Sequence, residues 1–388
     1  MNNFYKDKQQ ITEWLDTYEI KNYTLIPDEK YGFIVDVNGN VDLRGKDLIN
    51  IPVKFGEVSG DFYCSNNQLK SLEFSPQTVG CDFWCSDNQL TSLEFCPETV
   101  GGNFNCNNNK LNSLKFSPQT VEGSFCCSNN QLICLEFAPQ IIGGYFSCSY
   151  NKLTSLEFSP QTVGDDFSCS SNQLTSLEFS PTKVGADFYC SNNKLDSLEF
   201  SPQTVRGSFW CDGNKLKSLE FSPQTVGGDF NCNNNKLNSL KFSPQTVEGS
   251  FCCSNNQLIC LEFSPQTVSG DFYCSYNKLT SLKFSPQEIG GGFFCHDNQL
   301  TSLEFCPQTV KSSFNCENNE LISLEFCPQN VGRNFYCNDN PKLKKIQKIT
   351  DFNLIYLEHE KILITNFSDK LENDLTNDNS KKNNKMKI

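Results

Sequence analysis

The sequence predicts a mainly β solenoid, in which short repeats stack to form a parallel β-sheet. One 21-residue unit recurs in register, so that a cysteine returns every 21 residues from Cys64 to Cys337. Large apolar residues alternate with variable ones in each unit, as in Phe62-Tyr63-Cys64, and this alternation indicates a short strand. A proline such as Pro76 falls in each return segment and excludes a continuous helix there.

The repeats define the predicted array, residues 39–340. Thirteen full repeats cover residues 60–332. A divergent repeat precedes them at 39–59, and a broken one follows from 333, where Pro341 displaces the register. Residues 102–137 and 228–263 differ only at Asn103 and Asp229, which indicates that a block of six repeats was copied.

Each repeat offers six apolar positions for the interior, exemplified by Phe62, Cys64, Leu69, Leu72, Phe74 and Val79. Asn67 comes where the strand ends, and its amide can donate and accept, so we expect stacked asparagines to satisfy backbone groups there. Gly80 suits the tight corner before the next strand. Because one repeat cannot stabilise itself, neighbours must stack and the ends need caps.

The sequence predicts a cap at each end of the array. Ile11, Trp14, Leu15 and Tyr18 share one helix face, and residues 23–26 and 33–37 suggest a hairpin, so residues 1–38 are predicted to form an α/β N-terminal cap. Residues 352–364 are apolar, which predicts a C-terminal cap over 341–367 of undecided secondary structure. The polar segment 368–388 is predicted to be a disordered tail.

The repeat motif F-x-C-x-x-N-x-L resembles the leucine-rich-repeat strand segment L-x-L-x-x-N-x-L, with Phe and Cys at two leucine positions. The return L-x-F-x-P-x-x-V is similar to that of bacterial-type leucine-rich repeats, and the unit resembles arrays in phages, large DNA viruses and bacteria. The resemblance implies a leucine-rich-repeat solenoid with its parallel sheet on the concave face. Phe predominates over Leu inside, which leaves the curvature open, and a parallel β-helix with 21-residue turns is the rival fold.

Charge and cysteine content exclude several functions. A net charge of -13 repels phosphate, so we expect neither nucleic-acid nor membrane binding. The sequence has no secretory signal and no apolar run long enough to cross a membrane, so an intracellular location is expected, in the host-cell cytoplasm if the source is viral. The 22 cysteines are then expected to be reduced core thiols. Metal or redox roles are the alternative, although a straight ladder does not converge on one point as zinc requires.

The strands also carry residues that face outward. The position between Phe and Cys takes aromatic side chains on a face that folding does not require, and acids flank it. Tyr and Trp are enriched at binding hot spots, so we predict a partner site, although aromatics also simply suit strands. The predicted partner-binding residues are Tyr63, Trp84, Tyr189, Trp210, Tyr273, Phe294, Tyr336, Asp61, Asp82, Asp187, Asp229 and Asp271.

Two further features have less specific interpretations. Cys295-His296-Asp297 resembles a nucleophile with its base, but adjacent strand residues point to opposite faces, so we expect Cys295 in the core and His296 on the surface. The row that starts at Glu73 is mostly Glu, with Lys115, Lys241 and Lys283 interspersed, and is predicted to be a solvated edge.

The sequence therefore predicts a monomeric, non-enzymatic scaffold for a protein partner, with no cofactor and no metal. The copied block favours it, because added repeats lengthen a surface but would rarely leave an active site intact. The alternatives are a surface or adhesive protein that binds glycans or has a structural role, and the targeting module of a ubiquitin-ligase effector. The resemblance to such effectors implies a catalytic domain much longer than the chain after residue 341.

Overall fold

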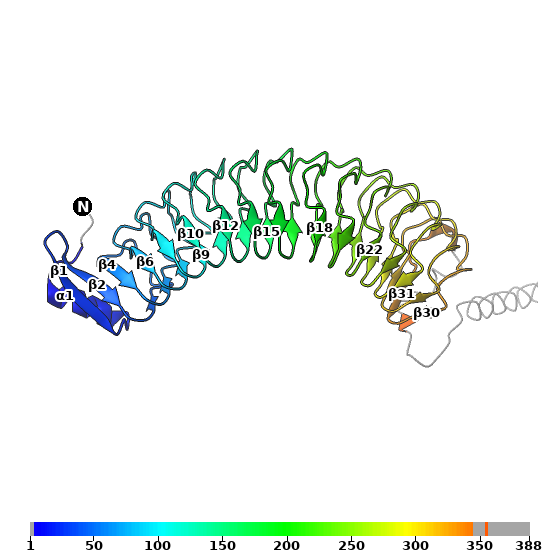
Figure 1. Ribbon diagram of the computed structural model, residues 1–388. Helices are drawn as coiled ribbons and strands as arrows, with labels where there is room; N and C mark the ends of the chain where they lie inside the picture. Colours follow the sequence, from blue (N-terminus) through cyan, green and yellow to red (C-terminus); the bar gives the residue numbers. More distant parts are fainter. Residues whose placement is uncertain (1–3, 344–353, 356–388) are drawn as a thin grey trace, which may run out of the picture. The chain divides into compact units, whose positions relative to one another are not determined.

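The computed structural model describes residues 4–343 and 354–355 of the chain. The chain divides into two compact units, Met1–Gly207 and Ser208–Ile388. In each unit, short parallel strands from successive repeats lie side by side and are joined by loops (Figure 1). The predicted parallel solenoid with a 21-residue period is therefore confirmed.

The first unit begins with helix α1 (Lys8–Thr17). Asp7 caps its N-terminus, because its carboxylate accepts hydrogen bonds from two free backbone N–H groups of the first turn. Ile11, Trp14 and Leu15 are buried, which confirms the predicted apolar face. Tyr18 is only half-buried, since it lies just beyond the last helical residue.

The predicted hairpin follows the helix. Strand β1 (Tyr23–Asp28) pairs antiparallel with β2 (Gly32–Val37), and the carboxylate of Asp28 accepts hydrogen bonds from two turn N–H groups. Strand β2 then pairs parallel with β4 (Phe55–Val58) of the divergent repeat. The hairpin thus covers the first edge of one repeat sheet.

The Phe-x-Cys positions form a parallel sheet in register, with Phe62 paired to Phe83 and so on along the chain. In the first unit its strands are β3 (Val41–Asp42), β5 (Phe62–Tyr63), β7 (Phe83–Trp84), β9 (Phe104–Asn105), β11 (Phe125–Cys126), β13 (Phe146–Ser147), β15 (Phe167–Ser168) and β17 (Phe188–Tyr189). In the second unit they are β19 (Phe209–Trp210), β21 (Phe230–Asn231), β23 (Phe251–Cys252), β25 (Phe272–Tyr273), β27 (Phe293–Phe294), β29 (Phe314–Asn315) and β31 (Asn334–Tyr336). We call the outward side of these strands the strand face.

The return segments form a second set of parallel strands. The sequence predicted only that these segments are not helical. In the first unit they are β6 (Thr78–Val79), β8 (Thr99–Val100), β10 (Thr120–Val121), β12 (Ile141–Ile142), β14 (Thr162–Val163), β16 (Lys183–Val184) and β18 (Thr204–Val205). In the second unit they are β20 (Thr225–Val226), β22 (Thr246–Val247), β24 (Thr267–Val268), β26 (Glu288–Ile289), β28 (Thr309–Val310) and β30 (Asn330–Val331). Each strand follows the proline, where the chain can extend but cannot continue as a helix.

The core between the strands is a ladder of identical side chains. Phe62 and Cys64 are 0% exposed, and the rings of Phe62 and Phe83 stack with centroids 5.6 Å apart. Leu69, Leu72 and Val79 are also buried. Gly80 fits the corner because an added Cβ would lie 2.1 Å from the carbonyl oxygen of Ser59, so close approach of the backbone explains this glycine.

The asparagine stack predicted at the strand ends is present. The Asn130 amide donates to the carbonyls of Cys106, Cys127 and Ser128 at 3.1–3.2 Å. Its oxygen accepts the N–H of Leu111 at 3.0 Å. One buried side chain thus satisfies four backbone groups of two repeats, which is what a solenoid turn requires.

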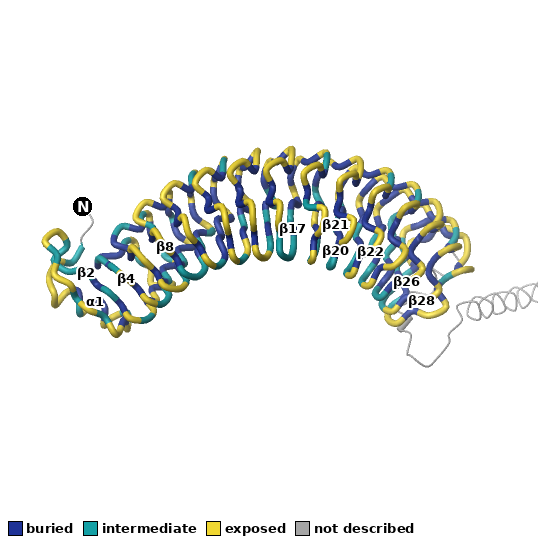
Figure 2. Tube along the Cα trace, viewed as in Figure 1, coloured by how far each residue is buried: buried dark blue, intermediate teal, exposed yellow. Residues whose placement is uncertain are grey.

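The prediction that the second Phe of each repeat fills the interior is wrong for twelve of the thirteen repeats. The side chains from Phe95 to Phe326 are 41–52% exposed, and only Phe74 is buried. The cause is a tight turn, in which the carbonyl of Leu177 accepts the N–H of Ser180 and the intervening Phe179 has φ +67°. A positive φ at this position turns the side chain out of the interior, and exposed residues recur along the loops (Figure 2).

The C-terminal end is described only in part. A 3₁₀ helix η1 (Pro341–Leu343) ends the array, and strand β32 (Leu354–Ile355) pairs antiparallel with β31. Most of the predicted cap at 341–367 and the whole predicted tail lie outside the described residues. In the described part of the chain, no helix is long and apolar enough to cross a membrane.

Candidate functional site on the strand face

The outward strand positions form a row in which each predicted aromatic is partly exposed. They lie between Phe and Cys residues that are buried, so the alternation predicted from the sequence holds. Trp210 is the most open of these aromatics, with 37% of its surface exposed. Small residues such as Asn105, Ser147 and Ser168 occupy the same row. The row is therefore aromatic at some strands and small and polar at others.

The first group joins Tyr63, Trp84 and Arg44. The rings of Tyr63 and Trp84 lie 4.9 Å apart, and the guanidinium of Arg44 lies 4.5 Å from the Tyr63 ring. Asp42 fixes this guanidinium through Nε and Nη2 at 2.9 and 2.7 Å. The sequence alone did not predict a role for Arg44. Leu43 occupies the cysteine position of the divergent repeat, and the place of Arg44 directly after it was a signal for this residue.

Two polar groups of this cluster have unusual surroundings. Burial, with the nearby Asp61 carboxylate, raises the pKa of Tyr63 to about 12, so its hydroxyl stays protonated near neutral pH. The Trp84 Nε1 atom is buried and has no hydrogen-bond partner among the described residues. Leaving a buried donor unpaired costs roughly 1–3 kcal/mol of stability.

A second aromatic pair lies in the second unit. The rings of Tyr273 and Phe294 stack at 4.5 Å with their planes 7° apart. The Tyr273 hydroxyl donates to Asp271 at 2.8 Å, and burial raises the pKa of this tyrosine. Offset stacks of this kind present a flat, rigid apolar surface with little entropy to lose on binding.

Two further predicted aromatics, Tyr189 and Tyr336, are held by polar neighbours. Tyr189 donates its hydroxyl to Asp187, and the Tyr336 hydroxyl accepts from the Asn334 amide at 2.6 Å. These contacts fix the ring orientations of Tyr189 and Tyr336. The row thus contains at least two aromatic pairs, Tyr63–Trp84 and Tyr273–Phe294.

The predicted acids have a structural role that the sequence did not indicate. The carboxylate of Asp61 accepts the backbone N–H of Asp82 at 3.0 Å, and Asp82 likewise accepts the N–H of Asn103 at 2.8 Å. Asp229 and Asp271 make the equivalent bonds in the second unit. One oxygen of each of these carboxylates joins neighbouring repeats, which leaves the other oxygen for a tyrosine hydroxyl or a partner.

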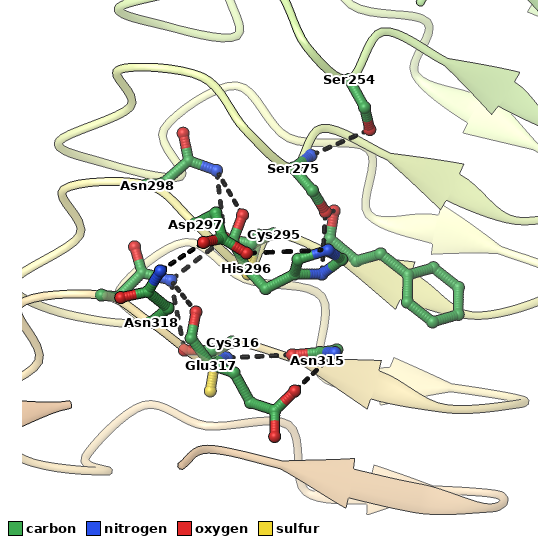
Figure 3. A network of polar contacts seen from close by, with 12 residues as sticks. Ser254, Ser275, Cys295, His296, Asp297, Asn298, Asn315, Cys316, Glu317 and Asn318 are labelled. Atoms are coloured by element: carbon green, nitrogen blue, oxygen red, sulfur yellow. Dashed lines mark hydrogen bonds and ion pairs between the residues drawn. The ribbon is translucent and has the colours of Figure 1, made fainter. Parts of the chain in front are cut away.

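The Cys-His-Asp segment is not a catalytic arrangement. Cys295 is 0% exposed and burial raises its pKa, whereas the His296 ring points to the other face, where Nδ1 lies 2.9 Å from the Ser275 hydroxyl (Figure 3). The two side chains are therefore not in contact as nucleophile and base. His296 thus lies on the outer face, as predicted, where it is half-buried and hydrogen-bonded.

The cysteine ladder provides no metal site in the described part of the chain. Groups of three or more metal-type ligands are absent from these residues. All 22 cysteines are free thiols, and burial raises the pKa of the ladder cysteines, to about 12 for Cys64. Such thiols are inert small hydrophobes.

Comparison with known proteins gives the fold. Protein-family models and curated proteins yield no match. YopM from Yersinia pestis, a leucine-rich effector protein, resembles the chain with a TM-score of 0.59 and 20% identity, over 77% of this chain and 88% of its own. The fold is a leucine-rich-repeat solenoid. YopM from Yersinia enterocolitica WA-314 resembles the solenoid with a TM-score of 0.51 and 21% identity, over 78% of each chain.

Proposed function

We propose that this leucine-rich-repeat solenoid is a non-enzymatic scaffold that binds a protein partner through the strand face. The observation that carries the proposal is the cluster in which Tyr63 packs on Trp84 with Arg44 beside it. Tyr, Trp and Arg are the three residues most enriched among binding hot spots. The core needs none of these three side chains, because the Phe and Cys ladders fill it.

The shape of the face supports a macromolecular partner. A parallel array presents identical strand positions one after another, so a partner can contact several repeats at once. The Tyr273–Phe294 pair offers a second rigid anchor of the same kind.

A capture experiment with two variants tests the proposal. The strand-face variant carries Trp84→Ala, Tyr189→Ala and Trp210→Ala. The control variant carries Ile133→Ala, Ile259→Ala and Ile322→Ala, three exposed apolar residues of the loops that lie outside the strands. Each variant and the wild type are first shown by circular dichroism to be folded. Proteins captured from cell extract are then identified and their affinity for the purified chain is measured.

We expect a partner that binds the wild type and the control variant equally well. Its affinity for the strand-face variant should be at least tenfold lower. If the partner bound the wild type and the strand-face variant with equal affinity, its binding site would not lie on the strand face. If no protein is captured and glycans bind instead, the scaffold proposal itself fails.

A further inference from the structure

Every full repeat holds a phenylalanine in a backbone conformation that suits glycine. Phe179 has φ +67° in the turn 177–180, which is closed by the Ser180 N–H bonded to the carbonyl of Leu177. This is the position where type II turns place Gly or Asn, and a bulky residue there is strained. The Ser180 hydroxyl in turn donates to the carbonyl of Phe200, so the same geometry recurs in the next repeat.

Burial of the ring in the core does not offset this backbone strain. Phe137, Phe158, Phe179 and Phe200 are 42%, 49%, 47% and 52% exposed. All thirteen full repeats nevertheless keep Phe at this position, whereas the outward strand position varies among Tyr, Trp, Asn, Cys, Ser and Phe. Repeat copying alone would not preserve one position and diversify the other, so the exposed ring itself has a use.

The residue before each ring indicates what the ring binds. It is Lys in three repeats, and each of these ammonium groups lies over its own ring, 4.9 Å from the centroid at Phe116, 4.8 Å at Phe242 and 5.0 Å at Phe284. It is Glu in the other ten. We call the exposed pairs 136–137, 157–158, 178–179 and 199–200 of the first unit the Glu–Phe row. Within the described residues, no cation lies over these four rings.

The N-terminal segment shows how the first ring of the series is covered. Phe4 and Tyr31 pack on Phe74 with centroids 5.1 and 5.8 Å away, and Phe74 is only 5% exposed. Lysines accompany both rings, with Lys6 over Phe4 and Lys30 over Tyr31. At the same turn, the ammonium of Lys54 donates to the carbonyl of Ser75 at 2.9 Å. A chain segment that carries lysines and aromatics is thus the cover that this surface already accepts.

We infer that the Glu–Phe row binds a lysine- or arginine-rich segment of a protein partner. Each partner cation would lie over a phenylalanine ring, as the lysine does at Phe116, and pair with the glutamate beside that ring. The net charge of -13 attracts such a segment and repels a nucleic acid. The row lies on the loop turns and shares no residue with the strand face, so its test and that of the proposed function can fail separately.

The probe for the test is a fluorescein-labelled octa-arginine peptide, whose binding to the full chain is followed by fluorescence anisotropy at physiological salt. The row variant carries Glu157→Lys, Glu178→Lys and Glu199→Lys. These lysines should fold over their own rings, as in the three natural Lys repeats, and leave no place for the probe. We expect about tenfold weaker binding. The reverse change, Lys115→Glu, should strengthen binding because it opens one more ring.

A charge-matched control separates this site from general attraction. Glu98→Lys, Glu122→Lys and Asp165→Lys change exposed acids of the same unit outside the row by the same total charge. We expect less than a twofold loss for this control. A third variant, Phe158→Gly, Phe179→Gly and Phe200→Gly, removes the rings, should fold because glycine suits the turn, and should also bind about tenfold more weakly.

Three results would overturn the inference. An equal loss in the row variant and in the charge-matched control would show that only the net charge attracts the peptide. Wild-type affinity in the glycine variant would show that the rings take no part. A wild-type chain that does not bind the peptide would show that the row has another use.

Discussion

Twelve of the thirteen full repeats carry two phenylalanines whose surroundings are opposite. On the strand, Phe167 is 0% exposed and stacks between Phe146 and Phe188 at 5.9 and 5.4 Å. In the loop turn of the same repeat, Phe179 is 47% exposed and has φ +67°. Packing holds the first ring, whereas the second is presented to solvent at a cost in backbone strain. Repetition of an apolar residue therefore does not by itself identify the core of a solenoid.

The largest effect should come from the strand ring. Phe167→Ala leaves a cavity in the ladder and should lower the free energy of unfolding by about 3–5 kcal/mol. Urea unfolding followed by circular dichroism measures this change. Hydrogen exchange should show the loss first in the repeats next to β15, because each repeat is stabilised mainly by its neighbours.

The control for this substitution is a ring in the loop turn. Phe158→Ala removes a side chain that is already 49% exposed, so it should cost at most about half as much. Equal losses at Phe158 and Phe167 would contradict the assignment of these two rings to different environments.

The strand could be predicted from the sequence because its signal is a simple alternation. Phe62 and Cys64 face one way and Tyr63 the other, and the 21-residue period places each strand beside its copies. Asn67 was also predictable, because a strand end near the core needs a side chain that both donates and accepts. These features depend on residue type and spacing alone.

The loop ring could not be predicted in the same way. In Ser71-Leu72-Glu73-Phe74-Ser75 the alternation continues, so the sequence predicts that Leu72 and Phe74 share one face. The turn breaks this alternation by a positive φ at Phe74. Gly or Asn would have signalled such a turn, and Phe conceals it.

The candidate site was predictable only as a row of positions. The sequence indicates that Tyr63 and Trp84 face outward, but not that Arg44 reaches the Tyr63 ring from the divergent repeat. It also places Asp61 beside these aromatics without indicating that the carboxylate accepts a backbone N–H of the next repeat. Such contacts depend on side-chain conformations that the repeat pattern does not specify.

Two neighbouring asparagines extend the contrast between inside and outside to polar residues. Asn130→Ala would leave four backbone groups without the bonds described above and should cost about 2–3 kcal/mol. Asn129 is exposed with φ +53°, so Asn129→Gly should change stability by less than about 1 kcal/mol. Urea unfolding of both variants checks the difference, and similar losses would mean that the buried amide is dispensable.

The sharpest comparison is the difference in stability between glycine and alanine substitutions. This difference is small, and its sign should be opposite in the two phenylalanine rows. At Phe179, glycine and alanine lose the same ring, but only glycine adopts φ +67° without strain, so Phe179→Gly should be about 1 kcal/mol more stable than Phe179→Ala. At Phe167 the order should be opposite, since glycine in a strand is about 0.5–1 kcal/mol worse than alanine.

Four urea unfolding curves, one for each of these variants, decide the matter. The expected order is glycine above alanine in the loop turn and alanine above glycine on the strand. Alanine above glycine at both positions would mean that Phe179 is not held in a strained turn. In that case strain would not indicate that the Phe179 ring is kept for binding, because an unstrained phenylalanine needs no compensating use.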